Sequence, residues 1–173
     1  MEMRKSTRTT IKWGLYVLLL FFLCGLQSAP GLFSIWGVKP VLVIPMAVAV
    51  AFFEREVATG IYGLLAGFLW DISAGKLFGF YGMVVMVCCV VVTLLTMYCI
   101  RVNLINILIA CLTVSLLCGL WDYVFYNLLW NYDGVGLYFW KMLARTFYTT
   151  LWMPPIYYLV RWITGLFSPS VRA

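Results

Sequence analysis

The chain has 173 residues, of which 65% are hydrophobic and only 10% are charged, and its mean hydropathy is +1.01. Soluble domains carry about 25% charged residues, so this composition excludes an ordinary soluble domain and indicates an integral membrane protein. The net charge is +6, but the basic residues stand at the ends of apolar runs. Membrane topology and anionic lipid explain that placement better than nucleic acid, so the expected surroundings are a lipid bilayer.

The residue types that usually carry catalysis or bind metals are scarce. The chain has no His, the commonest general base and metal ligand. Its six Cys form no C-x-x-C pair and lie in apolar runs, which is typical of packing positions. The sequence therefore predicts no catalytic residue, no metal site and no cofactor.

A membrane crossing needs roughly 20 residues. Taken in chain order, the apolar runs predict six membrane-spanning helices, of which the second is short. Pro40 is expected in the first turn of the second helix, where its missing N–H costs little. No segment outside these runs is long enough to fold alone, so residues 1–173 are expected to form a single multi-pass domain, an all-α bundle. The predicted helices cover Trp13–Ala29, Lys39–Phe53, Val57–Ala74, Leu77–Ile100, Asn103–Trp130 and Tyr138–Phe167.

The basic residues also predict an orientation. With the N-terminus inside, eight Lys and Arg lie on the cytoplasmic side and four outside, which favours cytoplasmic N- and C-termini. The alternative is that residues 1–29 are a signal peptide cleaved after Ala29. Such a cleavage site requires a small residue at the position that Gln27 occupies, so residues 1–29 are expected to be retained. The inner set is Arg4, Lys5, Arg8, Lys12, Arg55, Arg101, Arg161 and Arg172, and the outer set is Lys39, Lys76, Lys141 and Arg145.

The third predicted helix carries a stripe of small residues. Gly60, Gly63, Gly67, Asp71 and Ala74 follow one another at spacings of 3, 4, 4 and 3, which places them on one narrow helix face. In a membrane such glycines let a second helix approach closely. The stripe therefore predicts a packing or partner interface, with Asp71 turned toward protein.

Asp71 lies sixteen residues after Arg55, about 24 Å along the helix and in the outer third of the membrane. One interpretation is an interfacial acid that touches water at a helix end. The second is a buried acid that fixes helix packing, and the third is a proton or substrate site. A lipid-facing acid is disfavoured, because it costs roughly 2.5–3.5 kcal/mol near mid-membrane.

The fifth predicted helix has a similar face, formed by Cys111, Ser115, Gly119 and Asp122. The sixth helix begins at a similar depth with Lys141 and Arg145, one turn apart. We therefore expect intramembrane ion pairs in which Asp71 or Asp122 meets Arg145 or Lys141.

Glycine and proline mark two further features. Gly75, Gly79 and Gly82 surround a predicted tight turn between the third and fourth helices, because glycine accepts positive φ. Pro154 and Pro155 interrupt the sixth helix, which predicts a bend or break near residues 150–153.

Part of this pattern resembles a known family. A proline-led second helix and a brief charged turn precede G-x-x-x-D at Gly67 to Asp71, and L-x-G follows at Leu77 to Gly79. Over residues 38–92 the chain resembles MreD, the rod shape-determining membrane protein, with Gly67, Asp71 and Gly79 on the family pattern. Beyond that range the likeness is one of topology only.

The resemblance implies a non-enzymatic scaffold of the bacterial cell-elongation machinery in the plasma membrane, required for rod shape and lateral peptidoglycan synthesis. Its implied direct partner is MreC, with MreB, RodA and a class B penicillin-binding protein in the same assembly. It also implies a fold similar to the vitamin-binding S-components of energy-coupling-factor transporters.

Two other classes of function remain open. A vitamin-binding S-component-like subunit agrees with six helices and an outer polar cluster, although the Ala-x-x-x-Ala docking pattern of S-components is missing, since Trp13 to Ser28 contains no alanine. A membrane enzyme is disfavoured, because the chain lacks His and its acids are scattered.

Overall fold

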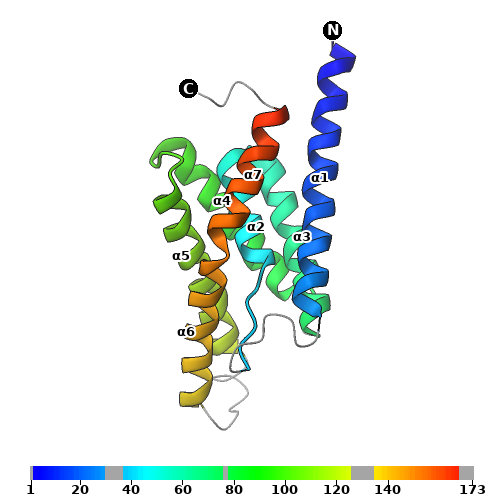
Figure 1. The fold of residues 1–173 in the computed structure, drawn as a ribbon. Coiled ribbons are helices and arrows are strands. Elements are labelled where there is room, and N and C mark those ends of the chain that lie inside the picture. The colour runs from blue at the N-terminus through cyan, green and yellow to red at the C-terminus, as the bar shows by residue number, and fades with distance from the viewer. Residues whose placement is uncertain (1, 30–36, 76–77, 126–134, 168–173) are drawn as a thin grey trace.

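A computed structural model describes residues 2–29, 37–75, 78–125 and 135–167 of the chain. The described residues form an all-α bundle without β-strands (Figure 1). The N-terminal end of α1 and the C-terminal end of α7 lie at the same end of this bundle (Figure 1). The helices are α1 (Glu2–Ser28), α2 (Val43–Phe53), α3 (Glu56–Ala74), α4 (Phe80–Tyr98), α5 (Leu104–Tyr123), α6 (Val135–Leu151) and α7 (Met153–Phe167).

Four helical segments of the described chain are long and apolar enough to cross a membrane: Thr7–Ser28 of α1, and α3, α4 and α5. This confirms the membrane character predicted from composition. The second helix, predicted to be short, is α2, and it has only 11 residues. At 1.5 Å per residue it is about 16 Å long, roughly half the thickness of a bilayer core.

The predicted start of the second helix is wrong. Residues 37–42 are not helical, and α2 begins at Val43. Gly37 has φ of 74°, and Pro40 disfavours helical geometry at the residue before it, which explains the extended chain. The proline in the first turn of α2 is Pro45 rather than Pro40.

α2 forms the centre of the bundle. Ten consecutive residues, Val43 to Phe52, are buried, as expected for a helix that is apolar on all sides. α3, α4, α5 and α7 pack around it. The hydroxyl of Thr93 on α4 donates to the carbonyl of Ala51 at 2.9 Å, which ties α4 to this central helix.

The break predicted near residues 150–153 is confirmed. α6 ends at Leu151 and α7 begins at Met153, with Pro154 and Pro155 in the first turn of α7, where their missing N–H groups need no helical partner. The N–H of Trp152 instead donates to the carbonyl of Thr149 at 3.2 Å.

Other helix boundaries also differ from the prediction. α1 extends at least eleven residues before Trp13, because hydropathy marks where lipid contact ends and not where the helix ends. α4 is shorter than predicted, at Phe80–Tyr98, and α5 begins at Leu104, one residue after the predicted start. Lys76, Leu77, Trp130 and Arg172, which the predictions used, lie outside the described residues.

Candidate functional site

The glycine face of α3 lies against α4. A β-carbon on Gly60 would lie 3.1 Å from Cγ2 of Val90, and one on Gly63 would lie 3.0 Å from Sγ of Cys89. At Gly67 the two backbones meet, since a β-carbon there would be 2.6 Å from the backbone nitrogen of Gly82. Packing within the chain therefore occupies the face predicted from the glycine spacing, so a partner protein has to use another surface.

Asp71 caps α4 from the neighbouring helix. Its side chain is buried, with 1% of the residue exposed. Oδ2 accepts from the N–H of Gly79 at 2.8 Å and from that of Gly82 at 3.4 Å, and Oδ1 accepts from the N–H of Tyr81 at 3.0 Å. Both oxygens of the carboxyl group therefore act as acceptors. The water-exposed interpretation of Asp71 is therefore wrong, and the interpretation as a buried acid that fixes helix packing describes this structure.

The sequence of the turn explains why a distant acid is needed. A helix begins with N–H groups that have no partner within the helix, and a polar side chain at the N-cap usually satisfies one of them. The N-cap of α4 is Gly79, at φ of 90°, which has no side chain to offer. Gly75 ends α3 in the left-handed conformation, at φ of 62°, so the predicted glycine turn is confirmed at both positions.

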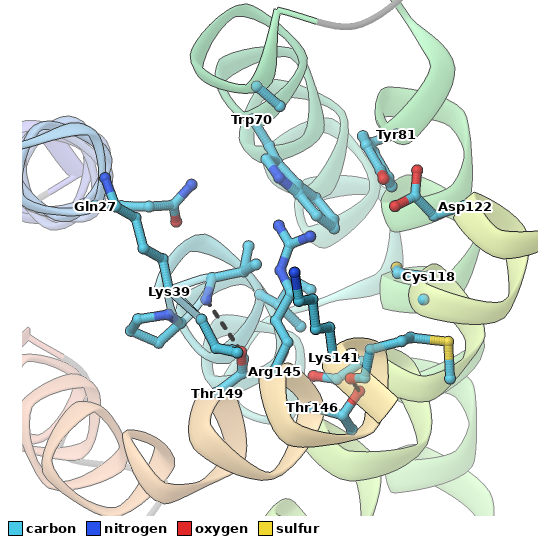
Figure 2. A pocket seen from close by; sticks show the side chains of 18 of the residues that line it. Gln27, Lys39, Trp70, Tyr81, Cys118, Asp122, Lys141, Arg145, Thr146 and Thr149 are labelled. Atoms are coloured by element: carbon cyan, nitrogen blue, oxygen red, sulfur yellow. Dashed lines mark hydrogen bonds between the residues drawn. The ribbon is translucent and has the colours of Figure 1, made fainter. Parts of the chain in front are cut away.

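A cavity of about 420 Å³ lies beside this cap. Its walls come from α1 to α6 and from the extended segment 37–42, and its lining includes Asp122, Lys141 and Arg145 (Figure 2). Non-helical backbone at membrane depth is tolerated where it is buried in protein or lines a cavity. Segment 37–42 meets this condition, and its Val41 N–H donates to Oγ1 of Thr149 at 3.0 Å.

Aromatic rings form one wall of the cavity. Trp70 stacks on Tyr81, with ring centroids 3.7 Å apart and an interplanar angle of 15°. The guanidinium carbon of Arg145 lies 5.5 Å from the centroid of the Trp70 ring, within the range of a cation–π contact. Figure 2 shows Lys141 and Arg145 projecting from α6 toward Trp70.

The predicted ion pairs have different outcomes. The carboxyl group of Asp71 accepts hydrogen bonds from backbone N–H groups at the start of α4. This cap takes the place of the predicted contact between Asp71 and Lys141 or Arg145. Asp122 is buried, with 3% exposed, and lines the same cavity as both basic residues. Its pairing with either of them stays a prediction.

The second small-residue face, on α5, packs against α6 at Gly119, where a β-carbon would lie 2.9 Å from Cγ of Met142. Among the described residues, no group of three or more His, Cys, Asp or Glu side chains has the arrangement of a metal site.

Sequence reasoning missed an ion pair between α1 and the end of α2. Nζ of Lys12 lies 2.6 Å from Oε1 of Glu54, and both side chains are about nine-tenths buried. The hydroxyl of Tyr16 lies 2.8 Å from Oγ1 of Thr164 and donates to Oε1 of Glu54 at 3.4 Å. The hydroxyl of Tyr62 donates to the carbonyl of Tyr16 at 2.9 Å. Lys12 and Glu54 are 42 positions apart, so no local spacing indicates that they meet.

Comparison of the chain with models of protein families, with curated proteins and with solved structures finds no match.

Proposed function

We propose that the chain is a non-enzymatic membrane scaffold of the MreD kind, which acts in cell elongation and lateral peptidoglycan synthesis through association with MreC. MreB, RodA and a class B penicillin-binding protein are the further members of the proposed assembly.

The observation that carries the proposal is the way the family-pattern residues come together. Gly67 lets α4 approach α3 at the backbone, and Asp71, one turn later, accepts from the N–H of Gly79. The three residues on which the resemblance rests therefore form one packing unit. A pattern that works as a unit supports a shared fold more strongly than three separate matches of common membrane residues.

The proposed topology is a six-pass bundle with both termini in the cytoplasm, similar in fold to S-components. The short α2 and the extended segment 37–42 together make one pass, and α6 and α7 together make another. In favour of this topology, the ends of α1 and α7 lie at one end of the bundle (Figure 1), and basic residues are more numerous on the loops and termini assigned to the cytoplasm.

Since the glycine face is occupied by α4, MreC has to contact exposed helix surfaces. α1 offers such a surface, because Leu18, Phe21 and Phe22 are 68%, 58% and 64% exposed. Lipid covers whatever a partner does not.

Co-purification tests the proposal. The chain is expressed with full-length MreC from the same organism and purified in mild detergent through a tag on MreC, with an unrelated single-span protein as the control bait. Co-elution with MreC alone is the expected result. Equal recovery with both baits, or recovery with neither, contradicts the proposal.

The cavity favours a second candidate, a vitamin-binding S-component-like subunit of an energy-coupling-factor transporter. A volume of about 420 Å³ lies within the roughly 300–1,000 Å³ of small-molecule sites. A vitamin that co-purifies with the chain, identified by mass spectrometry, supports this candidate over the scaffold.

A further inference from the structure

We propose that the cavity between α3 and α6 is an anion-binding site, which takes the phosphate or carboxylate group of a lipid headgroup or of a small soluble molecule. The ligand class follows from the charges of the lining and not from the proposed scaffold function.

Positive charge dominates the lining. Lys39, Lys141 and Arg145 line the cavity, and Asp122 is the only acidic residue among the described residues that do so. Lys141 and Arg145 are one turn apart on α6, where like charges repel each other. Whatever Asp122 contacts, the lining holds more positive than negative side chains, and a bound anion relieves that imbalance.

Backbone geometry adds to this charge. Val41 and Ile44 line the cavity, so the N-terminal end of the 11-residue α2 lies at its wall. A helix N-terminus carries a partial positive charge and N–H groups that suit an anion. In membrane proteins, broken helices with extended segments at the bilayer interior frequently surround binding sites in this way.

An aromatic wall also gives the cavity the character of a binding site. The Trp70–Tyr81 stack supplies a flat apolar wall for the uncharged part of the same ligand.

Arg145 is the central residue of the site. Its side chain is partly buried, and its guanidinium group lies beside Trp70, where it can donate several hydrogen bonds to one phosphate or carboxylate. Lys141 is exposed at the opening. We expect Arg145 to hold the anion and Lys141 to contribute attraction from the rim.

The test uses the purified full chain. Native mass spectrometry measures retention of phosphatidylglycerol against phosphatidylcholine, and calorimetry measures binding of glycerol 3-phosphate. Arg145→Gln and Lys141→Gln remove charge from the cavity, and Arg101→Gln removes one charge from an exposed position outside it. Loss of a charged hydrogen-bond partner is expected to weaken binding about tenfold or more in Arg145→Gln, less in Lys141→Gln, and not in Arg101→Gln.

Each outcome is decisive. Retention of phosphatidylglycerol alone identifies a lipid headgroup, binding of glycerol 3-phosphate alone identifies a soluble anion, and either supports the proposal if the cavity variants weaken it. Binding to neither probe, or binding that all three variants reduce equally, overturns it. If Arg145→Gln does not elute as a folded protein, Lys141→Gln decides alone, because its side chain is exposed. Failure of MreC to co-elute leaves these measurements unchanged, so the two proposals fail separately.

Discussion

Removal of the Asp71 carboxyl group tests whether this side chain holds α3 and α4 together. In Asp71→Ala, the N–H groups of Gly79, Tyr81 and Gly82 lose their acceptor. A buried N–H group left without an acceptor costs roughly 1–3 kcal/mol. Counting the two shorter bonds, we expect the free energy of unfolding to fall by about 2–6 kcal/mol. Asp71→Asn keeps one acceptor oxygen and is expected to lose about half as much.

The assay combines stability with a local reporter. Unfolding in detergent by titration with SDS gives the change in free energy, and hydrogen exchange reports the amides of Gly79 and Tyr81. Ile72→Ala is the matched control, because Ile72 is adjacent to Asp71 but is 66% exposed. The reasoning is refuted if Asp71→Ala unfolds like Ile72→Ala and both amides remain protected.

Three further substitutions test the packing of the bundle, each measured by the same unfolding titration. Gly67→Ala places a β-carbon 2.6 Å from the backbone nitrogen of Gly82 on α4 and is expected to cost at least about 3 kcal/mol of stability or to abolish folding. The control is Gly25→Ala, where no atom lies within 4 Å of the added β-carbon, and it is expected to be neutral or slightly stabilising. Equal effects of the two variants contradict the close approach of α3 and α4. Lys12→Met leaves the carboxylate of Glu54 buried without its partner and is expected to cost about 3–5 kcal/mol of stability. The double variant with Glu54→Gln is expected to recover most of this loss. If the stability losses of the two single variants simply add in the double variant, the ion pair is contradicted. Thr93→Val removes a buried hydroxyl that forms hydrogen bonds with α2 and α3 and is expected to cost about 1–3 kcal/mol of stability. An unchanged unfolding midpoint contradicts a stabilising role for these hydrogen bonds.

The glycine face of α3 could be predicted because its cause is local. Helix geometry alone places Gly60, Gly63 and Gly67 on one side, and the identity of the neighbouring helix does not alter that. The turn glycines and the break before Pro154 are of the same kind, since each follows from the conformations that one residue type allows.

The partner of Asp71 could not be predicted in this way. The predicted partners are side chains of opposite charge, whereas the actual partners are backbone N–H groups. Every residue except proline carries such a group, so these partners leave no mark in the sequence. The absence of a polar side chain at Gly79 was the available signal, because a helix that begins with glycine needs an acceptor from elsewhere. The Lys12–Glu54 pair and the place of Lys39 in the cavity depend on tertiary packing and have no such local signal.

The two polar regions of the bundle use their charges differently. Beside the middle of α1, Lys12 and Glu54 satisfy each other, and Tyr16 and Thr164 complete the network. Such a closed network leaves little to offer a ligand. Around the cavity, by contrast, basic side chains outnumber acidic ones and the apolar walls lower the local dielectric, so each unneutralised charge acts more strongly on an incoming anion than it would in water. On this argument the Lys12 network contributes stability, and the cavity is where binding by this protein is to be sought.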